Sequence, residues 1–477
     1  MAFLGLKRAP LPPGETDKVL GDNQTFASVD DIVMAPVLAH PLKTPRWWWI
    51  AFAISCVFLG VYIVSVIYLI ANGTGIWGNN IPTAWAMPII NFVWWIGIGH
   101  AGTLISAALL LFRQEWRTSI NRFAEAMTIF AVVCAGLYPI LHLGRPWVFY
   151  WLVPYPNTYG LFPQFRSPLD WDLFAISTYA SVSVLFWYIG LIPDLATLRD
   201  RHPYKLGKLF YGTLCLGWRG SAKHWQRYQR AYLLLAAVSF PLVLSVHSTI
   251  SFDFAVSQVP GWNNTIMPPY FVAGAVFAGF AMVLILAIPL RKLFKLEAFI
   301  TIKHLENSSI LMLATGMVVV YGYFIELFIA WYSGNEFERY MAYNRMFGED
   351  YWWAFWLLIF CNGVAIQPLW WKRVRQSPWA LFAISIVVSV GMWLERYVIV
   401  AITLTRDFLP SSWGLYNTTF WDWSLYIGSI FGVFSFLFLL FIRLLPSIAT
   451  SEMKETVRHI EHLGEPSENL TRPLEAH

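Results

Sequence analysis

Long apolar stretches recur along this chain, separated by polar or proline-containing segments. A helix of about 20 residues, rising about 1.5 Å per residue, crosses the ~30 Å hydrocarbon layer of a membrane. The pattern therefore predicts an all-α, multi-pass membrane protein. We place its ten transmembrane helices at about residues 47–71, 84–112, 123–151, 172–193, 231–257, 268–290, 308–332, 351–371, 379–404 and 422–445.

The charged residues between these stretches predict an orientation. The 477-residue chain is 57% hydrophobic and only 13% charged, which excludes a soluble domain, since those carry about 25% charged residues. Of the 33 Lys and Arg residues, 27 lie in the two tails or in alternate loops. The positive-inside rule places that side, with both termini, in the cytoplasm.

Three parts follow from this pattern. Residues 1–46 form a cytoplasmic tail that we expect to lie on the membrane surface or on a partner. Residues 47–446 form the transmembrane domain. Residues 447–477 form a charged cytoplasmic tail that we expect to be exposed. The chain shows no feature that would recruit a nucleic acid.

The cysteines argue against a metal centre in this chain. Cys56, Cys134, Cys215 and Cys361 lie far apart, and no C-x-x-C pair is present. Iron–sulfur clusters, zinc sites and covalently attached haem usually need closely spaced cysteines. We therefore expect no metal site and no covalently bound cofactor.

The segment from His142 to Asp172 concentrates polar groups at one predicted membrane surface. His142 and Arg145 close the third apolar stretch, and Asp170 and Asp172 open the fourth after a loop rich in proline and aromatic residues. Ionisable groups at the edge of the hydrocarbon are costly and usually functional. The orientation above puts this segment at the periplasmic face.

Further ionisable groups inside the apolar stretches share that periplasmic half. They are His247, Asp253, Glu326, Glu395, Arg396 and Asp422, with His100 near the middle of its helix. Charges used only to hold helices together would not need a one-sided distribution. An imidazole or carboxylate tuned towards neutrality can accept a proton from a hydroxylated ring. We therefore predict a quinol oxidation or quinone reduction site near the periplasmic face.

Structural roles compete with this interpretation at several positions. A lone intramembrane histidine such as His100 often only bonds to a neighbouring helix. Glu395 and Arg396 are adjacent, so each has a counter-ion beside it. Asp350 and Asp422 stand where N-caps are expected, beside aromatic residues.

Three other functions compete for the whole chain. His142 and His247 are candidate ligands of a b-type haem, although no predicted helix carries the two histidines of a di-haem arrangement. A proton-coupled transporter or channel would also need intramembrane charges. A purely structural membrane anchor would need no site.

Five motifs resemble one family. They are G-H-A-G-T-L-I-S at 99–106, R-F-A-E-A-M-T at 122–128, H-L-G-R-P-W at 142–147, F-R-S-P-L-D-W-D at 165–172, and D-F-A with the following P-G-W and P-P-Y-F-V-A-G-A at 253–275. In this order they resemble the NrfD/polysulfide-reductase-type integral membrane subunits, above all the C subunit of bacterial alternative complex III. The resemblance covers about residues 45–445.

The resemblance implies a fold and a set of partners. The fold is two four-helix bundles, about 84–257 and 268–404, flanked by helices 47–71 and 422–445. The protein would carry no redox cofactor and would oxidise quinol, here taken as menaquinol, near the periplasmic face. Electrons would pass to a periplasmic iron–sulfur subunit. A homologous membrane subunit, haem c subunits, and a cytochrome c or terminal oxidase as acceptor complete the expected complex.

The resemblance also assigns roles to residues. His142, Asp172 and Asp253 would be the catalytic quinol contacts. From the cluster of ionisable groups near the periplasmic face we add Arg145, Asp170, His247, Glu395 and Arg396 as further quinol-binding residues. The family is also proposed to conduct protons, and His100, Glu125 and Glu326 are the candidates for that route.

Overall fold

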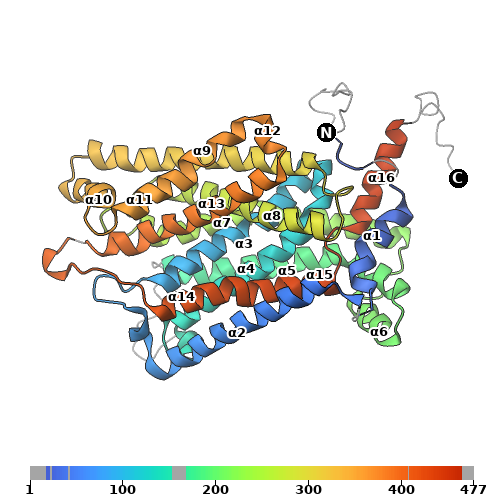
Figure 1. Ribbon diagram of the computed structural model, residues 1–477, viewed down its shortest axis with the longest axis horizontal. Coiled ribbons are helices and arrows are strands. Elements are labelled where there is room, and N and C mark those ends of the chain that lie inside the picture. Colours follow the sequence, from blue (N-terminus) through green and yellow to red (C-terminus); the bar gives the residue numbers. More distant parts are fainter. Residues whose placement is uncertain (1–17, 22–23, 41–42, 153–167, 407, 465–477) are drawn as a thin grey trace.

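The computed structural model describes residues 18–21, 24–40, 43–152, 168–406 and 408–464. Within these ranges the chain is helical, without a strand, and ten helical segments are long and apolar enough to cross a membrane. They run lengthwise through an elongated bundle (Figure 1). The predicted all-α membrane fold with ten spans is therefore confirmed.

Seven of the ten spans are single α-helices: α2 (Arg46–Asn72), α3 (Met87–Leu111), α4 (Asn121–His142), α5 (Pro168–Arg201), α7 (Ala222–Ala255), α8 (Met267–Leu293) and α9 (Ile302–Tyr332). The last three spans each contain a π-helical turn. The eighth joins α11 (Trp352–Ile359) to η6 (Phe360–Val364), the ninth joins α13 (Pro378–Tyr397) to η8 (Val398–Ile402), and the tenth joins α14 (Phe420–Ile427), η10 (Gly428–Phe434) and α15 (Ser435–Leu444).

Three predicted boundaries were wrong by eight or nine residues: the ends of the third and fourth spans and the start of the fifth, whose helix begins at Ala222. We expected the third to continue to residue 151, but α4 ends at His142. Gly144 follows in the left-handed region (φ 69°) and its N–H donates to the Leu141 carbonyl at 2.9 Å, which closes the helix. A 3-10 turn, η5 (Pro146–Leu152), then replaces the expected last turns. The fourth helix, α5, continues to Arg201 because Leu191, Leu195 and Leu198 keep its inner face apolar.

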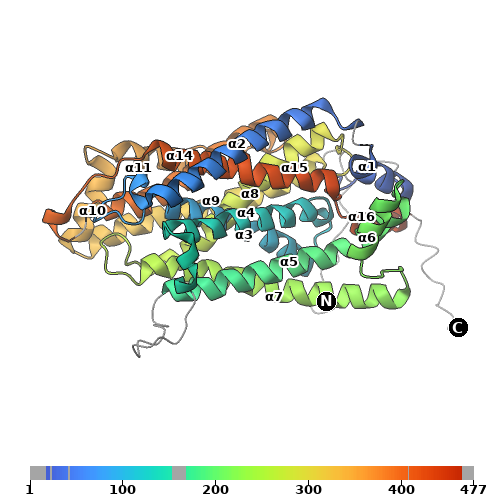
Figure 2. The ribbon, with the colours of Figure 1, turned by 90° about the horizontal axis from the view of Figure 1, so that it is seen from below.

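The centre of the molecule is α3, which packs against α4, α7, α8 and α13. Two glycines allow the closest crossings. A Cβ on Gly102 would lie 2.0 Å from the Ala124 carbonyl oxygen of α4, and a Cβ on Gly279 would lie 1.6 Å from Cβ of Ala101. Helix α2 is peripheral and packs mainly on the tenth span, while α5 and α7 run side by side on the opposite flank (Figure 2). The grouping into two four-helix bundles stays a prediction.

Both described tails pack at one end of the bundle. This end, called the α16 end, holds α1 (Phe26–Leu38), α6 (Lys205–Leu214) and α16 (Thr450–Gly464); the opposite, α10 end holds α10 (Glu336–Phe347) (Figure 1). Lys454 of α16 pairs with Asp30 of α1 at 2.7 Å. The expected exposure of the C-terminal tail was wrong for its described part, since Met453 and Val457 are buried. Their apolar side chains gain more from packing on the bundle than from solvent contact.

The α3–α8 crossing gives a direct test of this packing. Gly279→Ala should lower the stability of the protein by about 1–3 kcal/mol, because the added methyl group forces the two helices apart. The measurement is the thermal unfolding temperature of the protein in detergent. Gly60→Ala on α2 is the control, since nothing lies within 4 Å of a Cβ there. Equal unfolding temperatures for the two variants would contradict the close crossing.

Candidate functional site

Two carboxyl groups meet at the α10 end. Asp172 stands in the first turns of α5 and Asp253 near the end of α7, two helices that pack side by side. Their side chains are within hydrogen-bonding reach of each other. Two carboxyl groups can share a hydrogen bond only when one carries a proton. Asp172 and Asp253 are called the carboxyl pair below. They can hold a shared proton between α5 and α7.

The carboxyl pair is incompletely satisfied. Asp172 is buried and Asp253 half-buried, yet one oxygen of each, Oδ1, has no hydrogen-bond partner in the described part of the chain. Buried polar atoms are nearly always bonded, so unpaired ones leave a place for a ligand or a water. The third predicted contact, His142, lies at the end of α4 with its ring stacked on Trp77 at 6.2 Å between centroids.

His142 also has an unpaired atom, its buried Nδ1. No hydrogen bond or ion pair joins His142 to either aspartate among the described residues. Arg145 is exposed and Asp170 half-exposed, near the ends of the segment that joins α4 to α5. Residues 165–167 of the predicted F-R-S-P-L-D-W-D motif lie outside the described residues.

His100 and His247 form a pair deep in the bundle. Nδ1 of His100 on α3 lies 2.7 Å from Nδ1 of His247 on α7. Both Nε2 atoms are buried and lack a partner in the described ranges. The ring of Tyr179 meets His100 edge-on at 4.5 Å. His247, predicted for the quinol site, and His100, predicted for the proton route, therefore form one hydrogen-bonded pair.

This pairing bears on the haem alternative. His247 faces His100 and the ring of His142 faces Trp77, so the two proposed axial ligands have different neighbours. All four cysteines are free. In the described ranges, no group of three His, Cys, Asp or Glu side chains is placed to hold a metal ion.

Glu395 and Arg396 neutralise each other, as their adjacency suggested. Their side chains are fully buried and form an ion pair at 3.0 Å. The Tyr323 hydroxyl donates to Glu395, and the Arg396 guanidinium lies over the Phe271 ring at 4.1 Å. Phe271 in turn lies 6.0 Å from the His247 ring. This ion pair therefore borders the histidine pair through one aromatic ring.

The side chain of Glu326 is held in place at the α10 end. It forms an ion pair with Arg345 of α10 at 2.6 Å. Arg345 also donates to the Thr403 hydroxyl at 2.6 Å and to the Gly261 carbonyl at 3.2 Å. These bonds join α9, α10 and the end of the ninth span.

The two acids that we considered as caps behave differently. Asp422 accepts the Tyr416 hydroxyl at 3.0 Å and takes part in a capping box, but the N-cap is Thr419 and Asp422 stands three residues on, at N3. Asp350 instead forms an ion pair with Arg406 at 3.3 Å.

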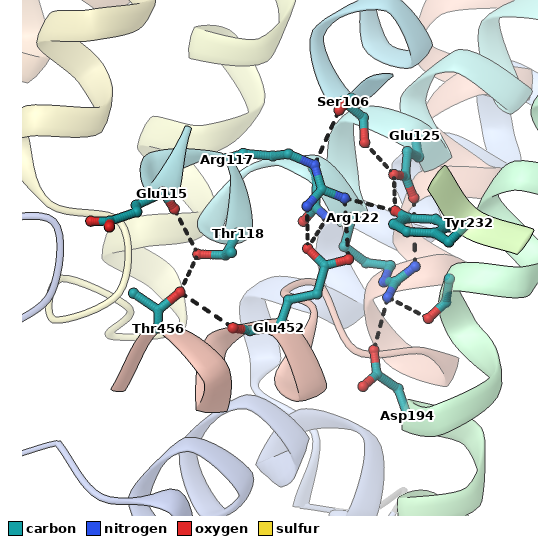
Figure 3. A network of polar contacts seen from close by, with 12 residues as sticks. Ser106, Glu115, Arg117, Thr118, Arg122, Glu125, Asp194, Tyr232, Glu452 and Thr456 are labelled. Carbon is teal, nitrogen blue, oxygen red and sulfur yellow. Dashed lines mark hydrogen bonds and ion pairs between the residues drawn. The ribbon is translucent and has the colours of Figure 1, made fainter. Parts of the chain in front are cut away.

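A second buried ionic cluster lies at the α16 end (Figure 3). Arg122 of α4 is fully buried and sits 3.0 Å from Asp194 of α5 and 3.5 Å from Glu125. Glu125 also accepts the Ser106 hydroxyl at 2.5 Å and the Tyr232 hydroxyl at 2.9 Å. Glu125, predicted for a proton route, thus belongs to an ionic network that reaches four helices.

Helix α16 completes this cluster from the C-terminal tail. Arg117 donates to both oxygens of Glu452, at 2.6 and 3.2 Å, and to the Tyr232 hydroxyl at 2.9 Å (Figure 3). Asn121 adds a third bond to Glu452 at 2.9 Å. The Thr450 hydroxyl donates to Asp194 at 2.5 Å. The name α16 cluster is used below for Arg117, Arg122, Glu125, Asp194 and Glu452.

The α16 cluster corrects the expectation that intramembrane charges share one half of the molecule. Arg122 and Asp194 stand just outside the predicted spans, so they were counted as loop residues. The R-F-A-E motif could have indicated the Arg122–Glu125 pair, because the two residues are three apart on one helix face. Two arginines face three acids in the cluster, so its charges balance when one acid holds a proton.

Further polar side chains lie in the interior between the two ends. Helix α3 presents Thr103 and Ser106 at three-residue steps after His100. The Thr103 hydroxyl donates to Ser183 of α5 at 3.1 Å, and Thr128 of α4 donates to the Gly99 carbonyl at 2.7 Å. The carboxyl pair, the histidine pair, these hydroxyls and the α16 cluster form what is called the polar column below.

Comparison with known proteins identifies the family. A model of the polysulphide reductase NrfD family matches residues 75–406, well over half of the chain. The chain belongs to the NrfD family. Its members are membrane subunits of multisubunit redox enzymes. The matched range contains both histidine rings of the central pair and the carboxyl pair, but not Glu452 or α16.

One relative, from Halobacterium salinarum, is described as a putative membrane subunit of dimethyl sulfoxide reductase. It is 26% identical over 266 residues, which cover 55% of this chain and 56% of the relative. The chain thus spans about half the length of the curated relative it matches.

The α16 cluster predicts the effect of a single amide substitution. Glu452→Gln should lower the free energy of unfolding by about 3 kcal/mol, because it removes the carboxylate that pairs directly with the buried Arg117. Thermal unfolding in detergent measures this. Glu455→Gln, at an exposed position of the same helix, should stay within about 0.5 kcal/mol of the parent. Similar unfolding temperatures for the two variants would show that α16 is held by its apolar residues alone.

Proposed function

We propose that this NrfD-family chain is the quinol-binding membrane subunit of a respiratory quinol oxidoreductase. In this proposal menaquinol is oxidised at the α10 end, which the distribution of Lys and Arg assigns to the periplasm. The observation that carries the proposal is the carboxyl pair, Asp172 and Asp253, with one unpaired oxygen on each acid. Family membership supports it, because it places the chain in a redox complex.

The carboxyl pair suits the acceptance of quinol protons. Oxidation of a quinol releases two electrons and two protons. A quinol hydroxyl would donate to an unpaired carboxyl oxygen, and the proton would pass to that carboxylate as the electron leaves. A pair that already shares one proton takes up only one more before both acids are neutral. The two protons therefore leave one at a time, towards the periplasm.

The surface beside the pair suits an apolar ring and tail. Trp147, Phe149 and Tyr150 of η5 and Leu169 and Phe174 of α5 are all exposed hydrophobic side chains. They lie near both ends of the segment that carries His142, the third proposed quinol contact, together with Arg145 and Asp170. Quinol would enter between these side chains from the bilayer.

The electrons need an acceptor outside this chain. An iron–sulfur subunit docked on the α10 end would receive them and pass them to haem c subunits, with a homologous membrane subunit alongside, as in alternative complex III. A cytochrome c or a terminal oxidase would be the final acceptor. The curated relative, named for a dimethyl sulfoxide reductase, supports a membrane subunit of a redox complex but names a different enzyme.

The polar column supports a route for protons through the first half of the chain. His100, His247 and Glu125 stand along it, with Thr103 and Ser106 between them. Glu326 lies at the α10 end, where it is paired with Arg345, and the column does not include it. The same column favours one competing function, a proton-coupled transporter or channel, which would act without any redox partner.

Substitution of the carboxyl pair tests the quinol site. Asp172→Asn in the assembled complex should lower menadiol oxidation by at least about 100-fold, because the amide cannot accept the quinol proton. Asp253→Asn should have a similar effect. Turnover is followed optically with ferricyanide as the acceptor, after assembly is confirmed by co-purification of the partner subunits.

The matched control is Asp350→Asn, an acid at the same end that pairs with Arg406. It should retain parental turnover. Unchanged turnover in assembled Asp172→Asn and Asp253→Asn complexes would remove the pair from the mechanism. A chain that purifies alone and carries protons in vesicles without an electron acceptor would favour the transporter.

The histidine pair separates proton movement from quinol chemistry. His100→Gln in the complex, reconstituted into vesicles, should reduce the number of protons moved across the membrane per electron while quinol oxidation continues. A pH-sensitive dye inside the vesicles measures the proton count. A proton count equal to that of the parent complex would exclude the column as the route.

A further inference from the structure

A cavity of about 260 Å³ opens at the α16 end, far from the carboxyl pair. Its walls come from α1, the connection to α2, the end of α8 and the end of α15, segments that Figure 1 shows meeting beside α16. Trp47, Trp48 and Phe294 provide aromatic surface, and the rings of Trp47 and Phe294 meet edge-on at 5.4 Å. The cavity thus brings together helices from both termini and the middle of the chain.

Three cations line this cavity, and no acid does so among the residues that the structure describes. The cations are Lys43 before α2, Lys295 after α8 and Arg443 near the end of α15. Lys43 and Lys295 are exposed, and neither has a recorded ion-pair partner among the described residues. The cavity is therefore electropositive.

The nearby charged residues that the structure describes do not neutralise the positive charge of the cavity. Arg443 donates to the Pro36 and Ala39 carbonyls at the end of α1, at 2.5 and 2.7 Å, so it faces backbone carbonyls and no carboxylate. The acids of α1, Asp30 and Asp31, are paired with Arg201 at 3.0 and 2.8 Å. The positive charge of the cavity is thus left for an external anion.

The depth of the cavity indicates which anion is available. Helix α2 enters the membrane at Trp47, Trp48 and Trp49, and tryptophans of this kind sit at the level of the lipid headgroups. Ile50, Ile54 and Val57 are exposed and follow Trp47 along one helix face. A continuous apolar stripe therefore leads from the cavity into the hydrocarbon.

We propose that this cavity binds the headgroup of an anionic phospholipid. Lys43 and Lys295 would contact the phosphate, because basic pockets between transmembrane helices are typical sites for acidic lipids. Trp47 would pack on the glycerol, and an acyl chain would follow Ile50 and Ile54. The bound lipid would join α1 and α2 to α8 and α15, elements that are distant in sequence.

A charge substitution with a lipid titration tests this site. The full-length protein in neutral detergent is titrated with dioleoyl phosphatidylglycerol, dioleoyl phosphatidylcholine or glycerol 3-phosphate, and its unfolding temperature is followed. Phosphatidylglycerol should raise the unfolding temperature of the parent protein. Phosphatidylcholine and glycerol 3-phosphate should not, since one lacks net negative charge and the other lacks acyl chains.

The Lys43→Gln/Lys295→Gln variant should bind phosphatidylglycerol roughly tenfold or more weakly, measured as the concentration that gives half of the shift. Lys292→Gln is the matched control, because Lys292 also lies at the end of α8 but stands over the Trp379 ring and not in the cavity. It should titrate like the parent. If the double variant and the control titrate alike, or if the parent responds equally to phosphatidylcholine, the proposal is overturned. A response to glycerol 3-phosphate alone would mean a soluble anion site and would overturn it as well.

Discussion

An arginine with no access to water needs its counter-charges, and Arg122 imposes this constraint on one whole end of the molecule. A buried ion left unpaired costs several kcal/mol, so Arg122, Asp194 and Glu125 must keep their places together. Asp194 also accepts a bond from Thr450, and Arg117 reaches Glu452. The starts of α4 and α16 and the end of α5 are thereby fixed as one unit. The opposite ends of α4 and α5 carry His142 and Asp172, so this unit also fixes where those two residues lie.

The two ends of the molecule satisfy their polar groups differently. At the α16 end nearly every charged atom of the cluster has a partner, and such networks hold a structure in one arrangement. At the α10 end Asp172 and Asp253 each retain an oxygen, and His142 a nitrogen, that is unpaired within the described part of the chain. Leaving these atoms without hydrogen bonds costs free energy. A site that binds and releases a ligand must still leave them available, because a bond from the protein would take the ligand's place. The difference between the ends is therefore one between a structural cluster and the proposed binding site.

Much of the fold could be predicted from the sequence, because runs of apolar residues determine where helices cross a membrane. Asp172 and Asp253 were named separately as quinol contacts from the motifs, and their contact with each other is what the structure adds. The α16 cluster could not be predicted: Glu452 meets Arg117 across 335 residues, and no local pattern encodes that contact. The pairing of His100 with His247, 147 residues apart, was hidden for the same reason. Helix ends depended on single residues such as Gly144, which a hydropathy average does not weigh.

The contact between the two Nδ1 atoms of His100 and His247 has a consequence for the direction in which protons can pass through the pair. In a neutral pair one ring must carry its proton on Nδ1, which leaves its Nε2 bare, while the other ring carries its proton on Nε2. The pair is therefore polarised and exists in two mirror states. A proton that arrives at the bare Nε2 sends the shared proton across 2.7 Å and releases another from the far ring, which reverses the polarity. Before a second proton can follow in the same direction, both rings must exchange tautomers, so each passage requires a reset.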